Sequence, residues 1–169
     1  MAKEFVLGME SLLISNATEQ FGSDNIVVIP MATIEELEAA MERHPKAFSV
    51  AAKMLQMKNP ELIDSAGDFY CALGWAFARG KDRKNEAFSK ETSVFSACAG
   101  AALYRKAVFE KIGDFDENHF AYLEDIDVGY RAEIYGYRNY YAPASVVLHA
   151  GSGSSGSRHN KFKVDLSSR

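Results

Sequence analysis

The sequence predicts a single α/β domain in which a sheet is flanked by helices. Short apolar or β-branched runs alternate along the chain with segments of helical periodicity, as they do in layered α/β proteins. The length of 169 residues is that of one domain. A composition of 47% hydrophobic and 25% charged residues is ordinary for a globular protein, which excludes the collagen-like, disordered and disulfide-stapled classes.

The first third of the chain is predicted to alternate helix and strand. The predicted elements are a helix over 9–21, a strand over 26–29, a helix from 33 to just before Pro45, and a strand over 48–55. Thr33 and Glu36 match a capping box, in which each side chain bonds a free backbone N–H at the start of a helix. Ile34, Leu37 and Met41 then share one helical face.

The remaining elements follow a turn predicted at Asn59-Pro60. They are a bent hairpin over 63–77, an irregular mobile loop over 79–91, a strand over 93–99, a helix over 102–111, a helix over 123–135 and a strand over 146–148. The hairpin segment is rich in glycine and aromatic residues, whereas the loop is highly charged. Gly113 and Gly136 are expected to end the two helices.

Charge is distributed unevenly along the chain. The net charge of −4 disfavours a nucleic-acid partner, which usually selects a basic protein. Residues 114–127 contain six acids and no base, while residues 150–169 contain four bases and one acid. We therefore expect a domain over 1–149 followed by a flexible, basic, Gly/Ser-rich tail over 150–169.

The sequence favours a reducing compartment. Cys71 and Cys98 lack CxxC spacing and lie in apolar surroundings, which predicts buried, inert thiols. No apolar run reaches the roughly 20 residues that cross a bilayer, and the first residues do not resemble a signal peptide. These observations predict a cytoplasmic protein without a transmembrane segment.

Three acids lie in or beside the first turn of the helix predicted over 123–135: Glu124, Asp125 and Asp127. They are open to two interpretations. Acids at this place complement the helix dipole, but a carboxylate kept ionised there can also act as a general base. Arg131 follows Asp127 by four residues and is expected to pair with it, which leaves Asp125 freer to do chemistry.

Other motifs are weaker. Residues 114–125 match part of a calcium-binding EF-hand loop, but His119 occupies the position that needs glycine. Residues 151–156 match GxGxxG without the helix that a dinucleotide site requires. His149 ends a predicted strand, where a histidine is more often packed than bound to metal, although its place before the basic tail favours a functional role. No nucleophilic triad or zinc spacing is present.

Taken together, residues 94–150 resemble the C-terminal half of the family-2 inverting glycosyltransferases, which have the GT-A fold. The resemblance is carried by five blocks: 99–105 (AGAALYR), 112–117 (IGDFDE), 120–131 (FAYLEDIDVGYR), Gly136-Tyr137 and His149. A weaker similarity runs back through 63–67 (IDSAG), so that the resemblance covers 45–150. It implies a partial GT-A domain, a mixed sheet flanked by helices of the Rossmann-related type that binds nucleotide-diphospho-sugars.

The resemblance also implies roles for individual residues. Asp125 would be the catalytic base, and Glu124 would help to orient the acceptor or the base. His149 would contribute to a Mn²⁺ or Mg²⁺ site under the donor diphosphate. The remaining residues implied in substrate binding are Cys98, Gly100, Asp127, Arg131 and Arg158, the last of them in the tail expected to fold over the diphosphate.

The implied reaction transfers a sugar, with inversion, from a nucleotide-diphosphate sugar to a hydroxyl of a glycan or lipid-linked acceptor. The family's nucleotide-binding half and its DxD motif have no counterpart before residue 60, which predicts that the chain is incomplete on its own. The alternative is a non-catalytic remnant that serves in binding or oligomerisation. A sheet interrupted in this way is expected to pair its open edge with a second copy or a partner chain, or to be covered by the N-terminal segment.

Overall fold

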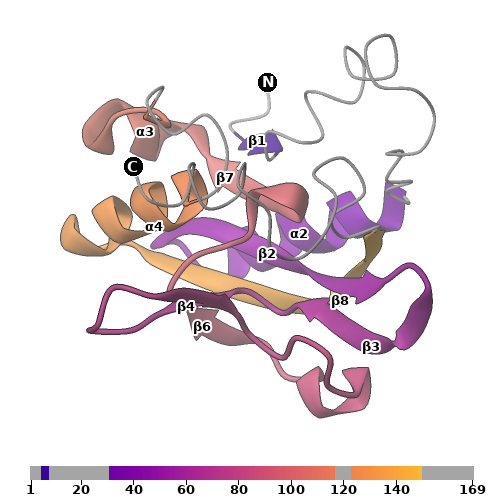
Figure 1. Cartoon of the computed structure of the whole chain (residues 1–169). Coiled ribbons are helices and arrows are strands. Elements are labelled where there is room, and N and C mark those ends of the chain that lie inside the picture. Colours follow the sequence, from indigo (N-terminus) through magenta and orange to yellow (C-terminus); the bar gives the residue numbers. More distant parts are fainter. Residues whose placement is uncertain (1–4, 8–30, 117–122, 150–169) are drawn as a thin grey trace, which may run out of the picture.

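The computed structural model describes residues 5–7, 31–116 and 123–149. Six strands form one mixed sheet, in which the order is β1-β7-β2-β8-β6 and β3 also pairs with β2 (Figure 1). These strands are β1 (Phe5–Leu7), β2 (Ala47–Gln56), β3 (Asn59–Ser65), β6 (Thr92–Val94), β7 (Ala102–Arg105) and β8 (Arg138–His149). A separate two-stranded hairpin joins β4 (Asp68–Tyr70) to β5 (Ala76–Ala78). The predicted α/β class, with a mixed sheet and flanking helices, is confirmed.

Strand β2 is the centre of the sheet. It runs parallel to β8 on one side, and on the other it pairs antiparallel first with β7 and then with β3. Its sequence, AFSVAAKMLQ, is almost continuously apolar because both faces of the strand are buried. The strand predicted over 48–55 is therefore confirmed.

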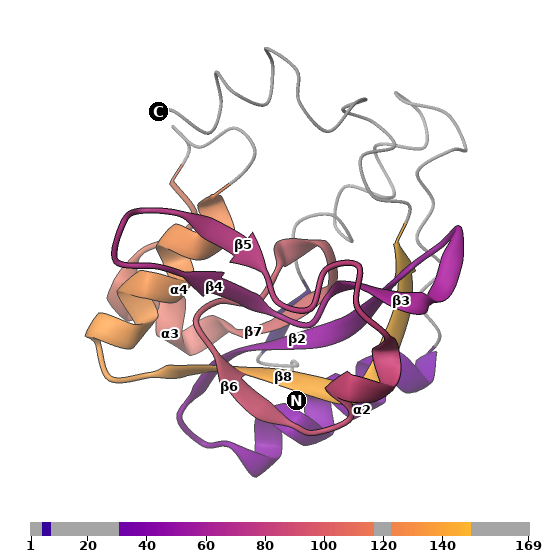
Figure 2. The same ribbon diagram turned by 60° about the horizontal axis from the view of Figure 1, so that its bottom comes forward.

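Helices cover both faces of the sheet, as Figure 2 shows. Helix α2 (Met31–Arg43) packs Leu37 and Met41 into one buried cluster with residues of β2, β7 and β8. Helices α3 (Lys106–Ile112) and α4 (Glu124–Ile134) contribute to the cluster on the opposite face, which contains Phe48 and Tyr104. Two of the three residues predicted to form the apolar face of the helix starting at residue 33, Leu37 and Met41, are thus in the core.

The helix predicted over 102–111 is wrong in its first half. Residues 102–105 form β7, and helix α3 begins only at Lys106. Leu103 and Tyr104 point into the two opposite core clusters, which requires the alternation of a strand. Pairing with β1 and β2 outweighs the local helical tendency of this alanine-containing segment.

The capping box predicted at Thr33 does not form. Helix α2 begins at Met31, so that Thr33 lies within its first turn. The Thr33 hydroxyl donates instead to the Val146 carbonyl (3.0 Å), and the Ser145 hydroxyl donates to the Thr33 carbonyl (3.0 Å). These two bonds fix the start of α2 against β8. Strand β8 runs from Arg138 to His149 and so includes Ser145, whereas the predicted strand covered only residues 146–148.

Segments between the core strands also differ from their predictions. The turn falls at residues 57–58, because Asn59 and Pro60 already belong to β3. The strand predicted over 93–99 is reduced to β6. Residues 79–91 are irregular as predicted but anchored, since the short 3₁₀ helix η2 (Asn85–Phe88) buries Phe88 and the Arg79 guanidinium lies over its ring. The predicted elements over 9–21 and 26–29, the tail over 150–169 and its GxGxxG motif lie outside the described residues.

Two expectations about compartment can be compared with the structure. Cys71 and Cys98 are not joined in a disulfide, as predicted, but both are half-buried rather than buried. None of the helices in the described part of the chain is long and apolar enough to cross a membrane.

The N-terminal segment covers one edge of the sheet. Residues 5–7 pair antiparallel with residues 103–105 of β7. Covering by this segment was one of the expected solutions for the open edge. The three-residue β1 becomes the edge strand in turn, and very short edge strands are poor templates for intermolecular pairing.

We expect Gly129→Ala to destabilise the protein. A Cβ atom at Gly129 would lie 2.6 Å from the Ser96 hydroxyl oxygen and 2.8 Å from the Ser96 Cβ, so helix α4 would have to move outward. Overpacking of this kind lowers the free energy of unfolding by about 1–3 kcal/mol, which urea denaturation measures. Ser96→Gly removes both close atoms, so the double variant should lose less stability than the two single losses added together. Additive losses would contradict this account of the contact.

Candidate functional site

Asp125 lies at the start of helix α4 and its carboxylate is held in place from two sides. One oxygen, Oδ2, accepts a hydrogen bond from the Ala99 backbone N–H (3.1 Å), and Oδ1 accepts one from the Ile126 N–H (2.8 Å). The Ser96 hydroxyl donates to the Asp125 carbonyl. The positive end of the helix dipole stabilises negative charge at this position.

The loop over 95–99, which supplies these contacts, is itself fixed by buried polar side chains. Asn139, on β8, donates to the Phe95 carbonyl (2.6 Å), and the Tyr104 hydroxyl, on β7, donates to the Ala97 carbonyl (3.0 Å). Both side chains are almost completely buried. The position of Asp125 therefore depends on the central sheet through two bonds that burial makes costly to break.

Asp68 is the second acid at this place. Its backbone N–H donates to the Ser96 carbonyl (2.9 Å), which brings the start of β4 against the same loop. Ligand atoms of Asp68, Cys98 and Asp125 all lie within 4.8 Å of one another. Burial raises the pKa of the Asp68 carboxyl well above its usual value, and the Asp125 carboxylate raises that pKa further. Asp68 is thus favoured as the protonated member of the pair.

Asp68→Asn is expected to stabilise the protein most at alkaline pH. A carboxyl whose pKa is raised by folding stabilises the native state fully below its unfolded value of 3.8, and that contribution is lost as pH rises through the folded value. Asparagine lacks this titration, so the difference from wild type should grow with pH, by about 1.4 kcal/mol for each unit by which the pKa is raised. Urea denaturation over a pH series measures it; a difference that does not change with pH would contradict the protonated state.

His149 is paired rather than isolated. Its Nδ1 lies 2.6 Å from Oδ2 of Asp64, on β3, and since a carboxylate only accepts, Nδ1–H is the donor. The Lys81 ammonium bonds the other oxygen of the same carboxylate. Burial would raise the pKa of Asp64, but the hydrogen bonds from His149 and Lys81 outweigh it and lower the pKa below its usual value. The Asp64 carboxylate is therefore ionised and buried, and its two partners are the Lys81 ammonium and the His149 ring.

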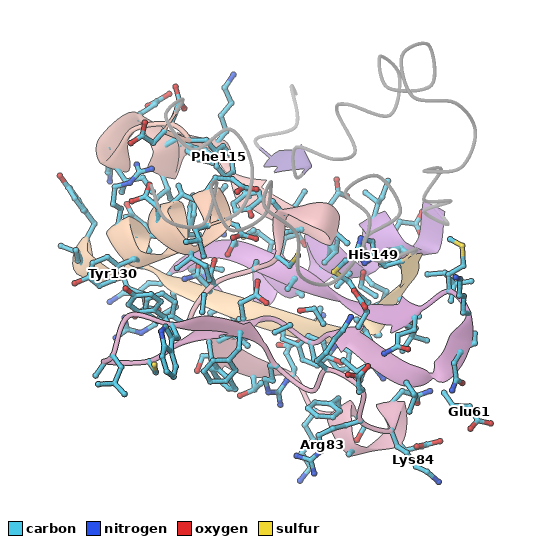
Figure 3. All side chains as sticks on the ribbon, in the orientation of Figure 1. Glu61, Arg83, Lys84, Phe115, Tyr130 and His149 are labelled. Carbon is cyan, nitrogen blue, oxygen red and sulfur yellow. The ribbon has the colours of Figure 1, made fainter. Side chains whose placement is uncertain are left out.

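The two acid clusters lie along one short segment. Asp64 lies near the end of β3, and Asp68 is the first residue of β4. The negative charge of Asp64 contributes to the raised pKa of Asp68. Figure 3 shows His149 and Tyr130 toward opposite ends of the sheet. The segment 64–68 therefore connects Asp64, the partner of His149, with Asp68, which lies beside Asp125.

Neither cluster fits the Mn²⁺ or Mg²⁺ expected from the sequence. Such ions prefer several ionised oxygen ligands. The carboxylate of Asp64 already bonds His149 and Lys81, and the second set contains a thiol, Cys98, and a carboxyl favoured in its protonated form, Asp68. The metal role of His149 stays a prediction, and no chemical step is derived through a metal below.

The structure places most of the other predicted site residues near Asp125. Glu124 begins α4 and has one carboxylate oxygen buried. Cys98 precedes, and Gly100 lies within, the short 3₁₀ helix η3 (Ala99–Ala101), on the loop that bonds Asp125. Arg158 lies outside the described residues. Whether these residues bind substrate stays a prediction.

The predicted pair of Asp127 and Arg131 forms. Two guanidinium nitrogens lie 2.6 and 2.9 Å from Oδ2 of Asp127. Arg131 also donates to the carbonyls of Ile112, Gly113 and Asp114. The pair therefore ties the end of α3 to the start of α4 and helps to hold the turn on which Asp125 lies.

Three residues of the site were not identified from the sequence: Asp64, Asp68 and Lys81. Asp64 lay within the weaker block 63–67 without an assigned role. The only sequence feature at Asp68 is an acid directly before a long uncharged run. Their partners are distant in sequence, 85 residues in the case of Asp64 and His149.

Comparison with known proteins supports a relationship to glycosyltransferases. No protein-family model matches the chain. The N-acetylglucosaminyl-diphospho-decaprenol L-rhamnosyltransferase of Mycobacterium tuberculosis (strain H37Rv) is 32% identical over 90 residues, 53% of this chain and 28% of that protein. The rhamnosyltransferase WbbL of Escherichia coli K12 is 30% identical over 103 residues, 60% of this chain and 38% of that protein.

The matches thus span only about three to four tenths of these relatives' own length. The mixed α/β architecture is compatible with a glycosyltransferase-like fold.

Proposed function

We propose that the chain forms the acceptor-binding and catalytic-base part of an inverting family-2 glycosyltransferase of the GT-A type. The observation that carries the proposal is the Asp125 carboxylate, fixed at a helix start by the Ala99 N–H and placed beside the buried Asp68. The rhamnosyltransferases among its relatives support the same class of reaction.

In the proposed reaction Asp125 removes the proton from an acceptor hydroxyl. The acceptor oxygen forms a bond to the anomeric carbon of the donor sugar, the bond from that carbon to the diphosphate oxygen breaks, and the nucleoside diphosphate leaves with its electron pair. Attack from the face opposite the leaving group inverts the anomeric centre. A carboxylate held by backbone N–H groups and a helix dipole stays ionised and positioned for the proton transfer.

Asp68 complements this role. A carboxyl that keeps its proton beside Asp125 avoids the repulsion between two adjacent carboxylates. It also leaves the pair with a single negative charge, which we assign to Asp125. Cys98 and Gly100, on the loop that bonds Asp125, would form the floor on which the acceptor lies.

The substrate class follows from the relatives. The mycobacterial relative is named for an acceptor in which N-acetylglucosamine is carried on diphospho-decaprenol, and both relatives are rhamnosyltransferases. We therefore propose a lipid-linked sugar as acceptor and a nucleoside diphosphate sugar, with rhamnose as the first candidate, as donor.

A transfer assay tests the proposal. The protein, purified from its own cells so that any partner accompanies it, is incubated with a nucleoside diphosphate rhamnose, a divalent cation and a short-chain prenyl diphosphate-linked N-acetylglucosamine. We expect mass spectrometry to show an acceptor enlarged by one deoxyhexose. If neither transfer nor acceptor binding is detected, the proposal fails and the non-catalytic alternative stands.

A further inference from the structure

The hairpin β4–β5 presents an unusual surface. Residues 69–78, FYCALGWAFA, contain no charged side chain. The large apolar residues among them are all exposed: Phe69, Tyr70, Leu73 (81%), Trp75 (71%) and Phe77 (53%). Several exposed large apolar residues close together on a folded domain are a sign of an interaction surface.

The apolar surface continues onto helix α4. The ring of Tyr70 stacks on Phe95 (5.4 Å between centroids), and Phe95 stacks on Tyr130 (5.9 Å). Tyr130 is half-exposed, and Ile134 and Tyr135 further along the helix are more exposed still. Ile126, Tyr130 and Ile134 follow one another at helical spacing, but of these three only Ile126 is buried.

The hairpin does not complete the core of the described part of the chain. It pairs with itself as a two-stranded sheet, and Phe69 faces Phe77 across the strands at 5.7 Å between centroids. Figure 2, in which this side of the molecule comes forward, shows the hairpin in front of the main sheet. Within the residues that the structure describes, its rings therefore remain exposed to a further contact.

Basic residues adjoin the hairpin. Residues 79–90 contain five bases and two acids, in a chain whose net charge is −4. Lys81 is bound to Asp64, whereas Arg83 and Lys84 follow the end of β5, opposite the hairpin turn, and lie at the bottom of the molecule in Figure 3. Lys84 is exposed. The hairpin thus has an uncharged aromatic turn at one end and an exposed basic segment following its other end, a combination that is complementary to lipid with anionic headgroups.

We propose that hairpin β4–β5 and the exposed face of α4, together with the bases of residues 79–90, dock on the surface of an anionic lipid membrane. Tryptophan and tyrosine suit the membrane–water interface because each combines a large apolar ring with a polar N–H or O–H group, while phenylalanine and leucine add apolar area. The bases approach the headgroups, while the apolar tip at Leu73 and Trp75 enters the boundary between headgroups and acyl chains.

Docking in this orientation would bring the site to its substrate. Tyr130 lies on the same helix whose first turn carries Asp125, so the docked surface continues toward the candidate base. A lipid-linked acceptor is confined to the same membrane surface. This last step rests on the proposed function, whereas the membrane contact itself does not.

Vesicle binding tests the contact directly. Trp75 is the single tryptophan of the chain, so its fluorescence reports on the hairpin alone. With vesicles of phosphatidylcholine and phosphatidylglycerol we expect the protein to float with the lipid and the Trp75 emission to shift to shorter wavelength. Brominated lipids should quench that emission. Vesicles of phosphatidylcholine alone should bind more weakly.

Two sets of variants separate the contributions. Leu73→Ser with Trp75→Ser should reduce vesicle binding about tenfold or more, and both side chains are too exposed for the change to unfold the core. Arg83→Gln with Lys84→Gln should reduce binding about tenfold, to anionic vesicles only. The matched control is Met57→Ser, which changes an exposed apolar residue on the β2–β3 turn. This variant should bind vesicles as well as the wild-type protein does.

Three results would overturn the proposal. They are a wild-type protein that does not float with anionic vesicles, hairpin variants that bind as well as wild type, and a Trp75 shift that depends on protein concentration without lipid, which would identify a second copy as the occupant. The proposed function has a separate readout. The variant with Leu73→Ser and Trp75→Ser should lose transfer to an acceptor embedded in vesicles but keep transfer to the short-chain acceptor. If the wild-type protein transfers sugar to neither acceptor, the proposed function is rejected and the membrane contact is unaffected.

Discussion

Asp125→Asn should lower the rate of sugar transfer by about 10²–10⁴-fold, the usual contribution of a general base. Asparagine keeps the size of the side chain and one oxygen that can accept from the Ala99 N–H, but its NH₂ group cannot accept from the Ile126 N–H. We therefore expect the loop and helix α4 to stay in place with a loss of stability of about 1 kcal/mol. The asparagine side chain cannot take up the acceptor proton. The turnover number should therefore fall while acceptor affinity changes little, and steady-state kinetics with varied acceptor separates the two quantities.

A matched variant shows whether the effect belongs to the base. Glu133→Gln removes the same charge from the other end of α4, where Glu133 pairs with Arg138 on the surface. We expect its turnover to equal that of wild type. If Asp125→Asn retains wild-type turnover, or if both variants lose activity equally, Asp125 is not the base.

Asp64→Ala is expected to produce the largest loss of stability. The substitution leaves His149 without the carboxylate 2.6 Å from its Nδ1 and leaves Lys81 without its anionic partner. Removing one member of a buried ion pair costs about 3–5 kcal/mol. Because Lys81 is more than one-third exposed and can recover solvent, we expect the lower end of that range for the free energy of unfolding, as measured by urea denaturation.

This loss should depend on pH. The pKa of Asp64 is lowered in the folded state, so its contribution is fully present above the unfolded value of 3.8 and is lost as pH falls through the folded value. The difference between wild type and Asp64→Ala should stay constant near neutral pH and shrink in acid below about pH 4. Glu61→Ala, on the exposed start of the same strand, should change stability little at any pH. A loss that is independent of pH would contradict an ionised Asp64.

Residue spacing and glycine stop signals predicted those elements whose boundaries depend on residues close in sequence. Helix α4 follows from its spacing and from Gly136, whose backbone adopts a positive φ of 83° and whose neighbour Tyr137 donates to the Ala132 carbonyl. Residues 102–105 were mistaken for helix because their strand exists only through pairing with β1 and β2, which are distant in sequence. Propensity contains no information about such partners.

The residues of the candidate site also divide into those that local sequence indicates and those that only the fold brings together. Asp125 could be singled out as a candidate because three acids lie together at the start of one helix, although its role as base came from the family resemblance. Asp64 and Asp68 could not, since their chemistry arises from burial and from His149 and Asp125, which only the folded sheet brings to them. Tyr130 likewise stacks on Phe95, a contact between distant segments that helical periodicity does not predict.

The most direct test of the account is to locate acceptor binding on the chain by NMR. The amide spectrum of the protein is recorded while a short-chain prenyl diphosphate-linked sugar is added. We predict that the shifted amides cluster at residues 98–101 and at the first turn of α4, and that Asp125→Asn leaves this pattern in place while sugar transfer is lost. Absence of shifts, or shifts confined to surfaces away from the loop and α4, would contradict the assignment of this face as the acceptor site.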